Sequence, residues 1–199
     1  MFAVGHIALG YILGTINGKF IGHNPNIPLL WIISLAPDID FLIPSLQHRG
    51  PTHSLILVIL LMMPLILTRS SKSTPYFAAL ATHSVGDYIT NGGAQILWPL
   101  NAQWYKIKWA LSITNPLEPL LEVSLFVILV ALLFSTKDIK RLIQSKNVSN
   151  IYILPLTAIL FLSALRYPIP IPSILTLPHL ALLIIIILPL LKNLSLTHV

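Results

Sequence analysis

Long apolar runs, separated by short stretches with proline, glycine or charge, dominate this sequence. Seven such runs occupy residues 3–22, 27–46, 53–68, 75–91, 117–134, 151–166 and 172–191. A helix needs roughly 20 apolar residues to cross a bilayer, so the third and sixth runs are short and are expected to be tilted or re-entrant. Charged residues make up only 9% of the chain, against roughly a quarter in soluble domains. The sequence therefore predicts an all-α, polytopic transmembrane bundle of about six or seven helices, some short or broken.

No low-complexity linker divides the 199 residues, which predicts one integral membrane domain over 1–199. The first run has no basic segment before it and is interpreted as a retained helix rather than a cleaved signal. The chain has no cysteine, which excludes disulfides and thiolate metal sites. Its net charge of +6 is spread over loops. The expected partner is therefore a lipid bilayer with anionic headgroups, and no nucleic acid.

Lysine and arginine are unevenly divided between the two sides of a seven-span topology. One side holds eight of them: Lys19, Arg69, Lys72, Lys137, Lys140, Arg141, Lys146 and Lys192. The other side holds four: Arg49, Lys106, Lys108 and Arg166. Because cytoplasmic loops carry the excess of these residues, we expect the first side to be cytoplasmic and the N-terminus to lie outside.

The first apolar run carries a glycine at every fourth position. These are Gly10, Gly14, Gly18 and Gly22, with His6 at the head of the same stripe. Small residues at this spacing let a second helix approach closely. The stripe therefore predicts a packing face, on which His6 points into the bundle rather than toward lipid.

Acidic residues are few and are placed where charge is expensive. Five of the six lie in or beside apolar runs: Asp38, Asp40, Asp87, Glu118 and Glu122. A charge at mid-bilayer costs at least ~2.5 kcal/mol, so such residues are functional candidates. In the seven-span topology all but Glu122 lean toward one side, together with His6, His48, Arg49, His53 and His83. That side is opposite the basic loops, so the sequence predicts one polar cluster at the non-cytoplasmic surface.

Local spacing indicates which of these side chains could share an ion. His83 and Asp87 are four residues apart and lie on one face of a helix. Asp38 and Asp40 would diverge by about 200° on a regular α-helix. Pro37 disfavours that geometry, and in a broken or extended turn both carboxylates could reach one centre.

Imidazole and carboxylate groups together are suitable ligands for Zn²⁺, Mn²⁺ or Fe²⁺. The number of such groups leaves room for one or more ions, and a bound cation would offset the repulsion among the carboxylates. Such an ion activates water and binds a phosphoryl oxygen. Arg49 is then the expected clamp for an anionic substrate, since a guanidinium can bind such a group through two hydrogen bonds.

Structural roles compete with several of these assignments. His83 and Asp87 could form a hydrogen-bonded pair, and Asp38 and Asp40 could cap a helix end. Glu118 fits a capping box at the start of its run. In each of these alternatives the side chain has a structural role and takes no part in metal binding or catalysis.

Other polar residues are interpreted as structural. Glu122 is expected to be structural or proton-binding, and His179 to be a bundle histidine whose hydrogen bonds are satisfied. Trp98, Trp104 and Trp109 predict an aromatic belt at the membrane interface. Such a belt would place the rim of the cluster at headgroup depth, where a lipid could enter laterally.

Five short motifs follow one another in the first two thirds of the chain. They are "GH" at 5–6, "PDID" at 37–40, "HRGPTHS" at 48–54, "HSVGD" at 83–87 and "LWP" at 97–99. In this order they resemble the YdjM-like family, which is described as LexA-regulated, membrane-bound, metal-dependent hydrolases. The resemblance implies a motif-bearing hydrolase core at 1–122, followed by additional transmembrane helices at 123–199. It implies a metal or catalytic set of His6, Asp38, Asp40, His48, His53, His83 and Asp87, to which it adds Glu118.

We therefore expect a metal-dependent hydrolase in which metal-activated water attacks an ester, in particular a phosphoester of a lipid or lipid-linked substrate. Zn²⁺ is the first choice of metal, with Mn²⁺ or Fe²⁺ as alternatives. The expected metal ligands are His6, Asp38, Asp40, His53, His83 and Asp87. The expected catalytic residues are Arg49 as the anion clamp and His48 or Glu118 as the acid or base, although His48 could instead orient a ligand. The rival functions are an ion- or proton-coupled transporter or channel, and a non-catalytic metal-binding membrane protein.

Overall fold

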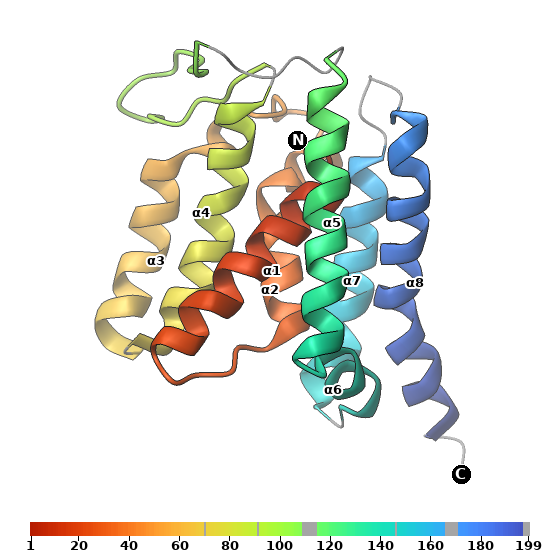
Figure 1. Ribbon diagram of the computed structural model, residues 1–199. Coiled ribbons are helices and arrows are strands. Elements are labelled where there is room, and N and C mark those ends of the chain that lie inside the picture. Colours follow the sequence, from red (N-terminus) through yellow and green to blue (C-terminus); the bar gives the residue numbers. More distant parts are fainter. Residues whose placement is uncertain (70, 91, 109–114, 146, 166–170, 197–199) are drawn as a thin grey trace.

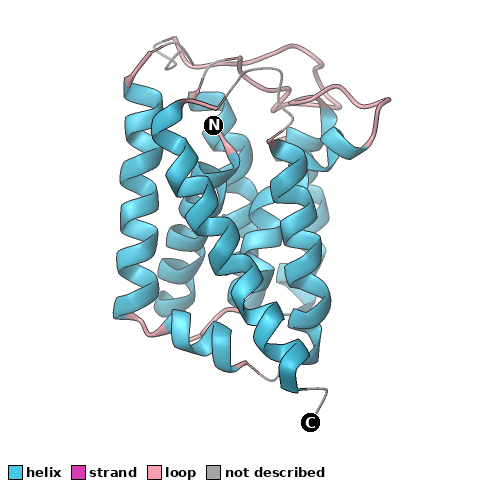
Figure 2. Cartoon of the chain, turned by 90° about the vertical axis from the view of Figure 1, so that its right-hand side faces the viewer, coloured by secondary structure: helices cyan, strands magenta, loops and turns pink. Residues whose placement is uncertain are grey.

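The computed structural model describes the chain except for residues 70, 91, 109–114, 146, 166–170 and 197–199, and shows a bundle of helices (Figure 1). The α-helices are α1 (Ala3–Phe20), α2 (Ile27–Leu35), α3 (Leu55–Arg69), α4 (Thr74–Ile89), α5 (Leu117–Ser135), α6 (Asp138–Gln144), α7 (Val148–Ala164) and α8 (Ser173–Leu196). Short 3₁₀ helices lie between them: η1 (Ala36–Leu42), η2 (Pro51–His53) and η3 (Ser71–Ser73). Figure 2 shows only helices and loops in the described part of the chain, so the predicted all-α class is confirmed.

Length and composition identify few of these helices as membrane-spanning. Among the described residues, α5 and the Ser173–Lys192 part of α8 are long and apolar enough to cross a bilayer. A third span results if the bent pair α6 and α7 is counted as one, and α3 is apolar but short. The predicted count of six or seven transmembrane helices is therefore wrong by this measure.

Helix breaks and polar residues explain why no described helix in the first half of the chain is long and apolar enough to span a membrane. The predicted run 27–46 is α-helical only to Leu35, where the chain tightens into η1. Pro37 lies at this junction and has no backbone N–H to continue the helix. The 16-residue α4 contains His83 and Asp87, and α1 contains His6. These helices are thus shorter or more polar than α5 and α8.

The predicted packing face is confirmed for the glycines within α1 but is wrong for Gly22, which lies beyond the end of the helix with no atom within 4 Å of its Cβ position. A Cβ atom on Gly10 would overlap the Ser34 hydroxyl of α2, and one on Gly14 would lie 2.7 Å from Leu30 Cδ2. The absence of side chains at these positions therefore lets α1 and α2 pack closely. His6, four residues before Gly10, is buried in the bundle.

The two ends of the bundle differ in chemistry (Figure 1). One end, here called the site end, holds the start of α1, η1, η2, the end of α4 and the start of α5. The opposite end, here called the basic end, holds the end of α1, η3 and α6. Five of the basic residues assigned to the cytoplasmic side lie in or beside these elements: Lys19, Lys72, Lys137, Lys140 and Arg141. Lys146 and Arg166, which also entered the charge count, lie outside the described residues.

Candidate metal centre

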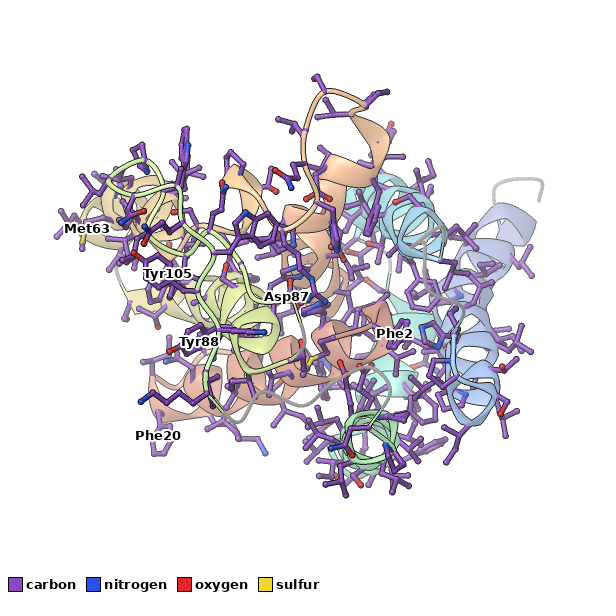
Figure 3. The ribbon with its side chains drawn as sticks, turned by 90° about the horizontal axis from the view of Figure 1, so that it is seen from above. Phe2, Phe20, Met63, Asp87, Tyr88 and Tyr105 are labelled. Atoms are coloured by element: carbon purple, nitrogen blue, oxygen red, sulfur yellow. The ribbon has the colours of Figure 1, made fainter. Side chains whose placement is uncertain are left out.

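Four elements bring the predicted ligands together at the site end of the bundle. His6 comes from the first turns of α1, Asp38 and Asp40 from η1, His53 from η2, and His83 and Asp87 from α4. All six side chains are buried. Figure 3, which looks onto this end, shows Asp87 near the middle of the bundle. The predicted convergence of residues distant in sequence is therefore present.

The donor atoms of this cluster approach one another at distances typical of metal ligands. His53 Nε2 lies 3.0 Å from His83 Nε2, 3.2 Å from Asp87 Oδ2 and 3.5 Å from Asp38 Oδ1. His83 Nε2 lies 3.4 Å from Asp38 Oδ1 and 3.6 Å from Asp87 Oδ2. Two ligands of a tetrahedral ion, each bound at about 2.1 Å, lie about 3.4 Å apart. The cluster can therefore hold a divalent cation without a large rearrangement.

Three overlapping groups of donors can be distinguished within the cluster. They are His6 with His83 and Asp87; Asp38 with His53 and His83; and Asp40 with His48 and His53. The first two groups share His83 and the last two share His53. The donors thus form a continuous row, which has room for more than one ion.

The orientation of His83 is set by the backbone of α2. Its Nδ1 donates a hydrogen bond to the Ser34 carbonyl oxygen, 2.6 Å away. This bond fixes the tautomer and leaves the Nε2 lone pair directed into the cluster, as is usual for histidines that bind metals. The ring of His6 stacks on His83 with the ring centroids 3.6 Å apart. The packing of α1 and α2 on α4 therefore also orders the cluster.

Asp38 and Asp40 face opposite nitrogens of His53. Asp38 Oδ1 lies near Nε2, whereas Asp40 Oδ2 lies 3.4 Å from Nδ1. Asp40 also accepts hydrogen bonds from the Arg49 backbone N–H at 3.2 Å and the Thr52 hydroxyl at 3.0 Å. The predicted break of the α-helix at Pro37 is confirmed, but the segment is a 3₁₀ helix rather than an extended turn, and its two carboxylates face different nitrogens of His53. Asp40 consequently belongs to a different donor group from Asp38.

The protonation of this segment follows from its contacts. Burial by itself lowers the pKa of the His53 imidazole, but the contacts with Asp38 and Asp87 outweigh burial and raise that pKa to about 9. Burial raises the pKa of the Asp38 carboxyl, but His83 and His53 outweigh it and hold that pKa well below its usual range. Without a bound cation, the His53 imidazole is therefore protonated at neutral pH and neutralises part of the carboxylate charge.

Arg49 is held with its guanidinium against the cluster. Its Nη2 lies 3.2 Å from Asp87 Oδ1, and its side chain is buried. Its backbone has a φ of 63°, in the left-handed region that non-glycine residues rarely adopt. Hydrogen bonds fix this conformation on both sides, since the Arg49 N–H binds Asp40 and its carbonyl accepts from Gln95 N at 3.0 Å.

The Glu118 carboxylate forms no hydrogen bond that would give it a structural role. It is buried at the start of α5, and neither carboxylate oxygen has a hydrogen-bond partner. Its charged neighbour is the Met1 amino group, whose nitrogen lies 3.7 Å from Oε1. The predicted capping box is not formed, because the side chain of Asn115 binds Leu117 N while the Glu118 carboxylate caps nothing.

A small hollow opens over these residues. Its volume is about 20 Å³, enough for about one water molecule. One part of its wall is polar, and the other part is apolar and comes from α1, η1 and the end of α7. The lining residues are Met1, Phe2, Ala3, Asp38, Phe41, His48, Arg49, Glu118 and Ala164.

Glu122, one turn further along α5, is structural as expected. Its two carboxylate oxygens accept hydrogen bonds from Phe2 N at 2.8 Å and Gly5 N at 3.2 Å. The carboxylate thus caps the start of α1, where backbone N–H groups have no partner within the helix. It holds His6 in place without contacting the ligand row.

The remaining predictions have mixed outcomes. His179 donates from Nδ1 to the Leu175 carbonyl at 2.7 Å, but its buried Nε2 has no hydrogen-bond partner, so the expectation of full satisfaction is wrong. Trp104 is 40% exposed, in keeping with an interfacial belt. Trp109 lies outside the described residues.

Three contributors to the cluster were missed from the sequence, one of which is the Met1 amino group, which donates to Asp87 Oδ1 at 3.2 Å. The Thr52 hydroxyl lies 3.0 Å from both Asp40 Oδ2 and His53 Nδ1. Its position between Pro51 and His53 within the "HRGPTHS" motif was the available signal. The Ser34 carbonyl gave no signal, because every residue has a backbone oxygen and only the packing of α2 on α4 selects this one.

A comparison with known protein families supports the resemblance that the motifs indicated. The model of the family described as YdjM inner membrane protein matches residues 1–167, which include α1 to α7. No curated protein and no solved structure matches the chain.

Proposed function

We propose, from the premise that this chain belongs to the YdjM inner membrane protein family, that it is a membrane-bound, metal-dependent hydrolase. The proposed substrate is a phosphoester of a lipid or of a lipid-linked molecule. The observation that carries the proposal is the row of buried imidazole and carboxylate donors, in which the His53 and His83 Nε2 atoms lie 3.0 Å apart.

The residues present fit a divalent cation. Asp87 Oδ2 is buried and its close partners are the His53 Nε2 atom at 3.2 Å and the His83 Nε2 atom at 3.6 Å. Grouping a buried carboxylate with imidazole nitrogens in this way is costly unless a proton or a cation lies between them. Asp38, His53, His83 and Asp87 would hold the ion, with His6 extending the row. Mixed imidazole and carboxylate donors favour Zn²⁺, and also accept Mn²⁺ or Fe²⁺. When bound, such a cation supplies Lewis-acid chemistry, by which water is activated and charge is withdrawn from the ester.

The residues around the hollow supply the other functions that ester hydrolysis needs. The Arg49 guanidinium binds the anionic oxygens of the substrate and neutralises their charge. Glu118, whose carboxylate is not engaged in hydrogen bonds, accepts the proton from the attacking water. His48 lines the same hollow and binds Asp40 through Nδ1 at 3.1 Å. It is thereby oriented to donate a proton to the leaving oxygen.

The chemistry of the residues that line the hollow, rather than its volume, favours a lipid over a soluble phosphoester. Because the hollow itself holds about one water molecule, the substrate would bind across its opening. Phe2, Phe41 and Ala164 form an apolar wall beside the polar floor, so a charged headgroup and an acyl chain would each meet matching surface. Leu42, which follows Phe41 in η1, is 46% exposed. The distribution of Lys and Arg supports a location of this end at the non-cytoplasmic surface of the membrane.

A hydrolysis assay on the purified full-length protein tests the proposal. The protein is stripped with a chelator and then supplied with Zn²⁺, Mn²⁺ or Fe²⁺ in mixed micelles of phosphomonoester and phosphodiester lipids. We expect metal-dependent turnover that falls by a factor on the order of 10³ in Asp38→Asn and in His83→Ala. His179→Ala, which removes a buried histidine outside the row, retains activity.

The transporter alternative is tested on the same preparations. Ion flux through the wild-type protein in liposomes, lost in His83→Ala, together with no turnover of any lipid under any metal, overturns the hydrolase proposal. Equal turnover in wild type and His83→Ala overturns the assignment of the ligand row.

A further inference from the structure

A second polar cavity lies at the basic end of the bundle, away from the metal centre. It has a volume of about 340 Å³ and adjoins a further cavity of about 280 Å³. The two share Asn24, Pro25, Ile27 and Arg141, so we treat them together as the basic-end groove. Volumes of this size are typical of ligand sites, whereas the hollow at the metal centre holds about one water molecule.

The groove lies at the opposite end of a membrane-spanning helix from the metal centre. Glu118 is in the first turn of α5 and faces the hollow, while Ser135 at the last turn lines the groove. A helix of 19 residues is about 28 Å long, close to the thickness of the hydrocarbon core. The groove therefore opens at the level of the other bilayer surface, which the charge distribution predicts to be cytoplasmic.

The charged residues of the groove come from two helices. Lys19 lies in the last turn of α1, and Arg141 and Asp138 come from α6. Asp138 is buried and is already neutralised, because it accepts hydrogen bonds from Arg141 Nη1 at 2.6 Å and from the Tyr11 hydroxyl at 2.7 Å. Among the described residues no ion pair joins Lys19 to a carboxylate. The groove thus carries a net positive charge.

The other charged residues at the basic end make the region around the groove more positive. Asp138 is one of six acids in the sequence, and the other five lie in η1, at the end of α4 and in α5. Lys72, Lys137 and Lys140 lie at the same end as the groove. The groove therefore lies in an uncompensated positive region.

The hydrogen-bonding groups of the groove match an anion. A guanidinium has five N–H donors, and Asp138 engages only Nη1 of Arg141. The Lys19 ammonium, the Asn24 amide and the Thr15 hydroxyl line the same cavity. A set of cationic and neutral donors around a cavity at a membrane surface suits a phosphate that carries polar substituents.

We propose that the basic-end groove binds the phosphate of an anionic phospholipid headgroup at the membrane surface opposite the metal centre, with Lys19 and Arg141 as its charged ligands. A soluble phosphate compound has the same chemistry. The lipid is the favoured source because the groove adjoins the end of a spanning helix, where headgroups are concentrated. This binding is independent of hydrolysis at the metal centre.

The test measures saturable stabilisation of the detergent-purified full-length protein by short-chain lipids. The probes are dioctanoyl phosphatidylglycerol, dioctanoyl phosphatidylcholine with the same tails but no net charge, and inorganic phosphate with no tail. The variant pair is Lys19→Gln with Arg141→Gln, in which the amide can still donate to Asp138. The control pair is Lys72→Gln with Lys140→Gln, which removes the same charge from the same end without changing the lining.

We expect phosphatidylglycerol to bind the wild type saturably and phosphatidylcholine to bind far more weakly. The groove pair weakens phosphatidylglycerol binding by about 25-fold, about fivefold for each charge, and the control pair by no more than about twofold. Equal losses in both pairs, or no saturable binding, overturn the proposal in favour of diffuse surface attraction. Equal affinity for inorganic phosphate, lost in the groove pair, overturns the lipid as source. Unchanged metal content in every variant shows that folding and the metal centre are intact.

Discussion

His53 Nε2 lies 3.0 Å from His83 Nε2, and the two imidazoles come from different elements, η2 and α4. His83 Nδ1 donates to the Ser34 carbonyl, so its Nε2 is an acceptor. His53 carries a proton at neutral pH because its pKa is raised to about 9, and can therefore donate to His83. His53 and His83 would both supply Nε2 lone pairs to a divalent cation at this position, and His53 would have to lose its proton for such a cation to bind.

His83→Ala removes a donor shared by two of the three ligand groups. We expect its affinity for Zn²⁺ to fall by more than about 100-fold, since loss of even an orienting partner of a ligand weakens binding by 10–100-fold. The metal content of dialysed protein, measured by elemental analysis, checks this. His179→Ala is the matched control, because that buried histidine lies outside the ligand groups. Equal zinc in the two variants would contradict the assignment.

Asp38→Asn and Asp40→Asn are expected to differ. Asp38 faces the Nε2 atoms of His53 and His83, whereas Asp40 is engaged by Thr52, the Arg49 backbone and His53 Nδ1. Asp40 therefore acts mainly by orienting His53, and its loss weakens zinc binding by about 10–100-fold. The loss in Asp38→Asn is larger. Zinc titrations of both variants measure the order, and the reverse order would assign the ligand role to Asp40.

The stability of the metal-free protein should fall as the pH rises, whereas the additional stability that zinc gives should increase. The folded-state pKa of His53 lies above its ordinary value of 6.5. Its contribution to the stability of metal-free protein is therefore fully present below pH 6.5 and is lost as the pH rises through about 9. Zinc must displace this proton, so the stabilisation by zinc grows over the same range.

Thermal unfolding in detergent between pH 6.5 and 9, with a chelator or with zinc, measures both trends. His53→Gln removes the titrating group and should flatten the metal-free curve. A metal-free stability that rises with pH in the wild type and not in His53→Gln would contradict the protonation assigned to His53.

Gly10→Ala tests the link between helix packing and the metal centre. The added Cβ overlaps the Ser34 hydroxyl, and overpacking of this kind destabilises by about 1–3 kcal/mol. Because the Ser34 carbonyl orients His83, zinc affinity falls as well.

The double variant Gly10→Ala with Ser34→Ala should recover part of both losses. It removes the overlapping hydroxyl and keeps the backbone carbonyl, although the Ser34 Cβ remains 2.8 Å from the new methyl group. Melting temperature and zinc affinity are measured together. Loss of stability without loss of zinc affinity in Gly10→Ala would separate the packing face from the metal centre.

Glu118→Gln and Glu122→Gln should have different consequences although the two residues are one helical turn apart. The Glu118 carboxylate has no hydrogen-bond partner, so its amide variant retains stability and zinc but loses hydrolysis. Glu122 accepts from two backbone N–H groups, and an amide has only one oxygen acceptor. We expect Glu122→Gln to lose about 1–2 kcal/mol of unfolding free energy. Melting curves and lipid hydrolysis, measured on both, distinguish the roles.

The sequence by itself determined the class of the fold and the members of the cluster. Apolar runs that are bounded by proline, glycine and charged residues predict helices, because a backbone in lipid must satisfy its own hydrogen bonds. Residues that are four apart in sequence, such as His83 and Asp87, lie on the same face of any α-helix. The alternation of runs then assigned Asp38, His53 and Asp87 to one end without knowledge of the packing.

Only the tertiary structure decided which role each of these residues has. The tautomer of His83 depends on the Ser34 carbonyl 49 residues earlier, and Glu122 is structural because α5 meets the start of α1. Pro37 was readable as a break, but the tight turn of η1 set Asp38 and Asp40 on opposite nitrogens of His53. The basic-end groove likewise exists only where α1 and α6 meet. Contacts over such separations depend on side-chain torsions and helix packing, which local spacing does not encode.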